Sequence, residues 1–138
     1  FEAAFASARV TNTQLARYLL RALELKRKGK AEPEWIPNGD VVINLEHVLP
    51  ENPDVNWPAF DADTAKLYYN RLGNMVLLQA SQNTLIGNSS FGDKKAVLKR
   101  STFMLTSEVG KKKKWEKEEI AARQKILAEL AVETWPLA

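Results

Sequence analysis

The chain contains no cysteine in its 138 residues. Disulfide bonds, zinc sites built from thiolates and cysteine nucleophiles are therefore all excluded. A fold of this length has to be held together by an apolar core, and a chain of this size is long enough to bury one. Its content of 45% apolar and 27% charged residues is typical of a globular protein rather than a disordered or fibrous one.

The chain is weakly basic, with a formal net charge of +3 and a sequence pI near 9.2. This balance is compatible with a polyanionic partner without requiring one. The strongest charge run is Lys111–Lys114. Such a run is typical of a solvated loop, and a phosphate-facing patch is the alternative if an active site lies nearby.

No apolar run is long enough to span a bilayer, and no signal-peptide pattern is present, so we expect no membrane association. The absence of cysteine favours a cytoplasmic location. We expect residues 1–138 to form a single domain. The start at Phe1, in alanine-rich sequence, indicates a piece of a larger protein.

The first half of the chain predicts a helix and a strand. Thr11–Gln14 form a capping-box pattern, and Gly29 is expected to end the helix that follows. The apolar stripe expected for this helix is Leu15, Tyr18, Leu19, Ala22 and Leu23. After a loop and turn over residues 30–40, Val41–Leu49 has the length and β-branched content of a strand.

The second half predicts short elements and a long final helix. A proline-rich loop anchored by Trp57 precedes a helix capped by Asp61 or Asp63 and closed by Gly73. A second strand is expected over Asn74–Gln79, followed by short helices beginning near Ser81 and Asp93. The final helix carries Ile120, Leu127, Leu130 and Ala131 on one stripe, with Trp115 and Trp135 at its ends.

The best candidate for chemistry is Glu46-His47, which includes the only histidine of the chain, at the end of the first expected strand. A carboxylate can bind a metal ion while the neighbouring imidazole takes a proton from water. Asn74 opens the second strand, and Asn83 follows nine residues later on a short helix. The alternative interpretation of a single histidine at a strand end is a structural hydrogen-bonding residue.

This arrangement resembles the HNH-type (ββα-metal, or His-Me finger) nucleases. It is most similar to the C-terminal nuclease domain of GmrSD-type, modification-dependent restriction enzymes. The matching motifs are Glu46-His47-Val48-Leu49-Pro50, Leu72-Gly73-Asn74-Met75-Val76-Leu77-Leu78, Asn83, Gly87-Asn88-Ser89-Ser90-Phe91-Gly92-Asp93-Lys94, Trp115, Ile120-Ala121-Ala122-Arg123 and Trp135. The resemblance implies an α+β, mostly helical fold, with a two-stranded sheet and helix flanked by N- and C-terminal helices.

The resemblance also implies roles for these residues. His47 would be the general base, and Glu46 and Asn83 would ligate Mg²⁺ or Mn²⁺. Asn74 would orient His47 and brace the loop between the strands. Lys94 and Arg123 would hold phosphate groups of the DNA.

Several alternatives stay open. Asn88 competes with Asn83 for the metal, although spacing favours Asn83 and a turn-closing role fits Asn88. Asn74, after Gly73, could be only a turn residue with positive φ. Arg123 could pair with Glu119 or another acid nearby. The chain also departs from many HNH nucleases by having asparagine in place of histidine at the last metal position, and no Cys-x-x-Cys pairs.

The function that the resemblance implies is a metal-dependent endonuclease that nicks or cleaves double-stranded DNA, as the effector of a bacterial anti-phage restriction system. Its implied partner is an N-terminal nucleotide-hydrolysing, modification-sensing domain of the same protein. The alternatives are a catalytically inactive DNA-binding module with the same fold, and a nuclease acting on RNA.

Overall fold

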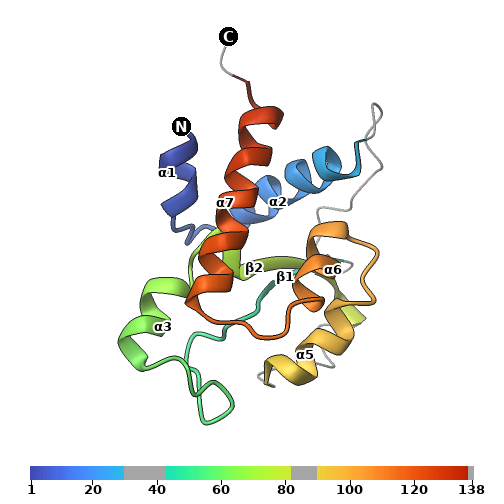
Figure 1. Ribbon diagram of the computed structural model, residues 1–138. Coiled ribbons are helices and arrows are strands. Elements are labelled where there is room, and N and C mark those ends of the chain that lie inside the picture. The colour runs from blue at the N-terminus through green and yellow to red at the C-terminus, as the bar shows by residue number, and fades with distance from the viewer. Residues whose placement is uncertain (30–42, 82–89, 137–138) are drawn as a thin grey trace.

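The computed structural model describes residues 1–29, 43–81 and 90–136. In this part of the chain, two short strands form an antiparallel sheet, and helices surround it (Figure 1). Strand β1 (Ile43–His47) pairs with β2 (Met75–Gln79), in a register that sets Ile43 opposite Gln79 and His47 opposite Met75. The expected α+β, mostly helical fold is confirmed. The helix expected to carry Asn83 falls on residues 82–89, outside the described residues.

The helices are α1 (Glu2–Ser7), α2 (Thr13–Lys28), α3 (Ala62–Tyr68), α5 (Phe91–Leu98), α6 (Met104–Gly110) and α7 (Lys117–Thr134), with a 3-10 turn η1 (Leu72–Asn74) before β2. Figure 1 shows α7 running through the middle of the molecule, where it packs against α1, α2 and η1. No helix in the described ranges is long and apolar enough to cross a membrane.

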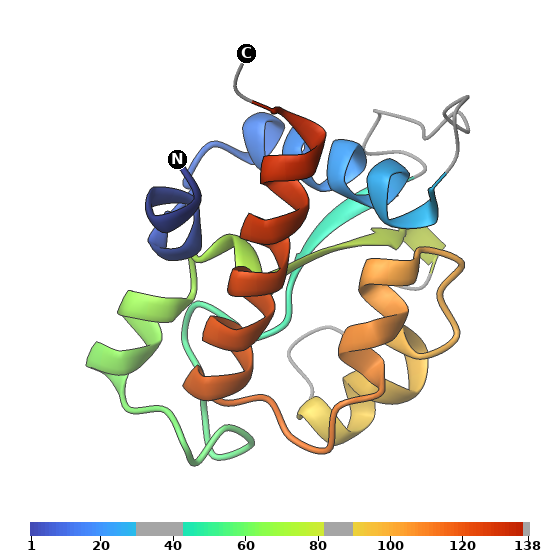
Figure 2. The ribbon, with the colours of Figure 1, turned by 45° about the horizontal axis from the view of Figure 1, so that its top comes forward.

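Strand β2 is buried on both faces, which is why its sequence is a continuous apolar run. Met75 and Leu77 pack into a core with α2, α6 and α7, whereas Val76 and Leu78 pack into a second core with α5, α7 and the loop that follows β1. Successive side chains of a strand point to opposite faces, so β2 separates the two cores. Figure 2 shows the sheet behind α7, with α2 above it and α5 and α6 beside it.

Helix α2 ends as expected, and its buried stripe keeps Leu23 from the expected set but not Leu15 or Tyr18. Gly29 closes it in the left-handed conformation with φ 68°. Asn12, rather than Thr11, is the N-cap, because its side chain accepts a hydrogen bond from the Leu15 N–H. Leu15 and Tyr18 are 48% and 54% exposed. The buried residues are Ala16, Arg17, Leu20, Leu23 and Glu24.

The other helix boundaries differ from expectation where tertiary contacts set them. Asp61 caps α3 through the Thr64 N–H, as one of the two candidates expected, but α3 ends before Gly73. Ser90 caps α5, one turn earlier than the expected start at Asp93. Helix α6 was not expected, because its cap is distant in sequence: Glu24 of α2 accepts hydrogen bonds from the Met104 and Leu105 N–H groups.

Trp57, in the loop between β1 and α3, is buried, in agreement with its predicted anchoring role.

Candidate active site

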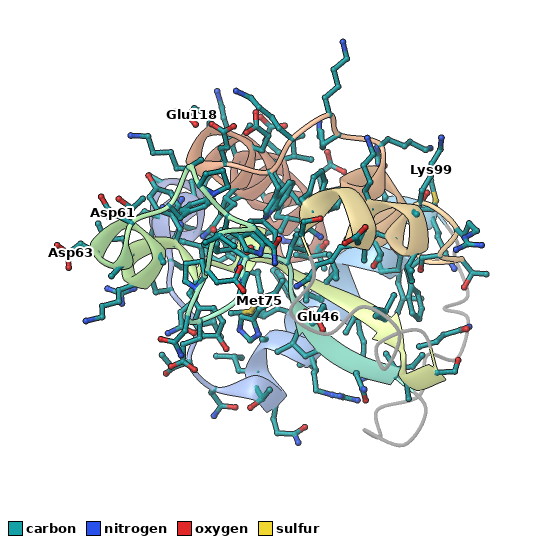
Figure 3. The ribbon with its side chains drawn as sticks, turned by 90° about the horizontal axis from the view of Figure 1, so that it is seen from below. Glu46, Asp61, Asp63, Met75, Lys99 and Glu118 are labelled. Carbon is teal, nitrogen blue, oxygen red and sulfur yellow. The ribbon has the colours of Figure 1, made fainter. Side chains whose placement is uncertain are left out.

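An open pocket of about 340 Å³ lies beside the end of β1. It is lined by Leu45, Glu46, His47, Pro50, Glu51, Asn52 and Tyr69. Pro50 belongs to the turn that ends the strand, so the pocket forms where the chain leaves the sheet. Figure 3 shows Glu46 near the centre of this side of the molecule, whereas Asp61 and Asp63 point outward from α3. The pocket therefore brings together the acid and the base that the sequence selected.

His47 is the last residue of β1 and is partly buried. Burial lowers the pKa of His47 to about 4, and the nearby Lys94 charge acts in the same direction. Both effects disfavour the imidazolium. A neutral imidazole at neutral pH has a free ring nitrogen that can accept a proton, which a general base requires.

Glu46 is held by Lys94. The Lys94 Nζ lies 3.2 Å from Glu46 Oε1 and donates to the carbonyls of His47 (3.2 Å) and Val48 (2.9 Å). It also lies 5.6 Å from the centre of the Trp57 ring. Burial raises the pKa of Glu46, while the Lys94 charge and hydrogen bond lower it.

Lys94 is therefore not the exposed phosphate contact that the sequence suggested. Its side chain is fully buried, and its ammonium group is already surrounded by the carboxylate and backbone oxygens of β1. A cation enclosed in this way fixes the end of β1 and the Glu46 carboxylate, and does not face a substrate in this arrangement.

Asn74 is fully buried. Its Oδ1 accepts hydrogen bonds from the Leu49 N–H (2.8 Å) and the Trp115 indole N–H (3.0 Å). Its Nδ2 donates to the carbonyls of Leu49 and Tyr69, both at 3.0 Å. No non-glycine residue in the described ranges has a positive φ, so Asn74 is not a left-handed turn residue. It braces the loop that follows His47, and no hydrogen bond joins it to the imidazole within the described structure.

Arg123 also differs from its expected place. It is only 7% exposed, and its guanidinium donates to the carbonyls of Gly73 (2.9 Å) and Met75 (2.7 Å). Burial lowers its pKa to about 10. The Glu119 side chain instead accepts from the Glu116 N–H at the start of α7. Arg123 thus fixes the entry to β2, and neither the expected phosphate contact nor the alternative pair with Glu119 is present in this geometry.

The two candidates for the last metal position, Asn83 and Asn88, lie outside the described residues. The remaining donors at the pocket are the Glu46 and Glu51 carboxylates and the Asn52 amide. Oxygen donors of this kind fit Mg²⁺ or Mn²⁺. Among the described residues, however, no group of three or more histidine or acidic side chains is close enough to hold a metal ion. Glu46 therefore fits as one ligand, and a complete site needs a donor from elsewhere.

Tyr69, which the sequence did not select, lies against His47. The two rings are nearly parallel, at an interplanar angle of 18°, with centroids 4.1 Å apart. Tyr69 directly follows α3, next to a second tyrosine at position 68. Nothing in the local sequence distinguishes the two, so the contact depends on the tertiary structure alone.

The family model described as "GmrSD restriction endonucleases, C-terminal domain" matches residues 1–130 of the chain. No curated protein matches it.

Proposed function

Because the chain belongs to the family of GmrSD restriction endonuclease C-terminal domains, we propose that it is a metal-dependent DNA endonuclease with His47 as its general base. A restriction-endonuclease domain of this family is a nuclease that acts on DNA. The observation that carries the finer proposal is the pocket that Glu46 and His47 share. With its pKa lowered to about 4, the His47 imidazole is neutral at neutral pH and keeps a ring nitrogen free to accept a proton, although it is a weaker base than an ordinary histidine.

In the proposed reaction, a ring nitrogen of His47 takes a proton from a water molecule in the pocket. The water oxygen forms a bond to the phosphorus of the scissile phosphate, and the bond from phosphorus to the leaving sugar oxygen breaks. Glu46 and Asn83 would hold Mg²⁺ or Mn²⁺. When bound, such an ion stabilises the charge that develops on the phosphate and its leaving oxygen.

In this proposal, Lys94 and Asn74 act by holding other groups in place. Lys94 holds the Glu46 carboxylate by its 3.2 Å contact and so limits the directions in which that ligand can point. Asn74 fixes the loop that begins after His47 through both polar groups of Leu49. Precise placement of reacting groups lowers the barrier of a hydrolytic reaction, so these contacts support the chemistry without touching the substrate.

We further propose that the domain is the effector of a bacterial anti-phage restriction system. In that setting its partner is an N-terminal, nucleotide-hydrolysing domain that senses modified DNA. The family description supports the restriction role. The competing proposal is a DNA-binding module that keeps the fold without activity.

Supercoiled plasmid incubated with the protein and Mg²⁺ or Mn²⁺ tests the proposal. We expect open-circle or linear DNA, no product with EDTA, and loss of product in His47→Ala and Glu46→Ala. The exposed Gln14 on α2 provides a control, since Gln14→Ala should cut as the wild type does.

Activity that survives His47→Ala would exclude His47 as the base. DNA binding without cutting under any metal would support the inactive module. A single-stranded RNA substrate in the same assay distinguishes the RNA alternative. Asn83→Ala and Asn88→Ala, compared over a range of Mg²⁺ concentrations, identify the second ligand, because only its loss should raise the metal requirement steeply.

A further inference from the structure

The Tyr69 ring stacks on the His47 imidazole. The rings stack with centroids 4.1 Å apart and an interplanar angle of 18°, and both residues line the same pocket. In the part of the chain that the structure describes, no hydrogen bond to the imidazole accompanies this stack. Among these residues, the Tyr69 ring is therefore the contact that bears on the plane of the imidazole.

The backbone of Tyr69 is fixed independently of the stack. Its N–H donates to the Ala65 carbonyl at the end of α3 (2.8 Å), and its carbonyl accepts from Asn74 Nδ2 (3.0 Å). Asn74 directly precedes Met75, which pairs with His47 across the sheet. The segments that carry the two rings are thus tied to the same short stretch of chain, so the stack does not depend on a flexible loop.

A general base needs an orienting partner, because the second torsion of a histidine side chain has broad minima. In many hydrolases a carboxylate or carbonyl supplies this by accepting a hydrogen bond from the other ring nitrogen. An aromatic ring stacked on the imidazole restricts the same torsion by steric contact. The stacked ring leaves the edge of the imidazole, which carries the two nitrogens, uncovered.

We propose that Tyr69 is a positioning residue for the reaction: its ring holds the plane of the His47 imidazole so that a ring nitrogen faces the pocket. This inference rests on the proposed role of His47 as the base. The ring performs this function, and the hydroxyl group is not required for it. Phenylalanine should therefore replace Tyr69 in this role, whereas leucine, which is apolar but has no ring, should not.

The stack can be measured without any nuclease activity, because His47 is the only histidine in the chain. Its carbon-bound ring protons give one pair of signals in a ¹H–¹³C aromatic NMR spectrum. A ring above the imidazole shifts these protons upfield. We expect upfield signals in the wild type and Tyr69→Phe, and a movement towards the values of an unstacked histidine in Tyr69→Leu.

Tyr68 provides a matched control. It precedes Tyr69, is also partly buried, and lies 5.5 Å from the Arg71 guanidinium rather than against His47. Tyr68→Leu is the same substitution one residue away, so it should leave the His47 signals and the turnover unchanged. Thermal unfolding of each variant shows whether it is folded at the assay temperature.

In plasmid cutting, Tyr69→Leu should lower kcat about tenfold or more with little change in KM, because a displaced base slows the chemical step. Tyr69→Phe should retain activity. In the His47→Ala background, Tyr69→Leu should cause no further loss, since the two residues act through one group.

The inference is overturned if the wild-type His47 signals are not shifted upfield, or if Tyr69→Leu removes the shift but cuts normally. It is also overturned if Tyr69→Phe keeps the shift but loses as much activity as Tyr69→Leu, since the hydroxyl would then be the important group. A wild type that does not cut any substrate contradicts the proposed function itself, and is distinct from these results.

Discussion

The side-chain amide of Asn74 satisfies both backbone polar groups of Leu49. Its Oδ1 accepts from the Leu49 N–H at 2.8 Å, and its Nδ2 donates to the Leu49 carbonyl at 3.0 Å. The Asn74 carbonyl also accepts from the Val48 N–H at 2.9 Å. One residue thus extends the sheet pairing past His47 and sets the direction in which the chain leaves the pocket.

Asn74→Ala should lower the free energy of unfolding by about 3 kcal/mol or more. The substitution leaves the Leu49 N–H and the Trp115 indole N–H buried without their acceptor, and each such group costs roughly 1–3 kcal/mol. Urea unfolding followed by tryptophan fluorescence measures the change. The exposed Asn52→Ala should shift it by less than about 0.5 kcal/mol. An equally small change in the free energy of unfolding for Asn74→Ala would show that the Asn74 hydrogen bonds contribute little to stability.

Lys94→Met should destabilise the fold by about 3–5 kcal/mol, because it leaves the Glu46 carboxylate partly buried without its cation. The double variant Glu46→Gln/Lys94→Met has no unpaired charge at this contact. Its loss in free energy of unfolding should be smaller, by about 1 kcal/mol or more, than the sum of the losses in the two single variants. Denaturant unfolding of the three variants gives this coupling. Lys95→Met, on the same helix, is the control. Additive single effects would mean that the 3.2 Å contact is energetically unimportant.

Gly73→Ala should destabilise the protein by about 1–3 kcal/mol or more. A Cβ at position 73 would collide with the Ile120 carbonyl oxygen and lie 3.0 Å from the Gln124 Cβ, and both belong to α7. Gly92→Ala is the matched control, because a Cβ there would meet only the Ser90 Oγ, at 3.7 Å. Thermal unfolding of both variants tests the prediction, which fails if their midpoints fall equally.

The Glu24 cap of α6 should give a defined pH dependence. Burial raises the pKa of Glu24, and the hydrogen bonds from Leu105 and Met104 lower it by less. With the folded pKa above the unfolded one, the folded state binds more protons between the two values. The contribution that Glu24 protonation makes to the free energy of unfolding is therefore fully present below the pKa of Glu24 in the unfolded state. It is lost as the pH rises through the pKa of Glu24 in the folded state.

Glu24→Gln does not titrate, so its stability deficit relative to the wild type should shrink as the pH rises from the unfolded pKa of Glu24 through its raised folded pKa. Urea unfolding of both proteins at several pH values measures the difference, in which other titrating groups largely cancel. The exposed Glu129→Gln should show no such trend. A deficit that grows with pH would mean that the two N–H donors outweigh burial.

The lysine run between α6 and α7 should contribute to DNA binding. Lys113 and Lys114 line a hollow of about 230 Å³ together with Trp57, whose ring lies beside Lys94. Trp57 and Lys94 thus connect the hollow to Glu46, because the Lys94 ammonium group lies near both. Removing both charges in Lys113→Ala/Lys114→Ala should lower the slope of log K against log salt by about 1–2 units.

Fluorescence anisotropy with labelled duplex, in the His47→Ala background to prevent cutting, measures this slope. Lys26→Ala/Lys125→Ala removes the same charge from α2 and α7 and should have a smaller effect. Equal effects of the two double variants would show that the run acts only through the net charge of the protein.

The local sequence was sufficient to predict those elements whose ends are set by caps or whose type is set by a short apolar run. Gly29 ends α2, Asp61 caps α3, and the apolar run before Gln79 forms a strand. Glu46 and His47, selected from the sequence as the candidate acid and base, line one pocket, because they are adjacent in the chain at the end of a strand. Covalent proximity and short-range hydrogen bonds determine such features.

The environment of each charged residue, by contrast, was decided by tertiary structure. The sequence places Lys94 and Arg123 among plausible phosphate contacts, yet both are buried against backbone carbonyls of residues 46 to 50 positions away. The Tyr69 stack on His47 has the same origin. Whether a cation faces solvent or supports a strand depends on which distant segments pack over it, and long-range packing fixes this only once the chain has folded.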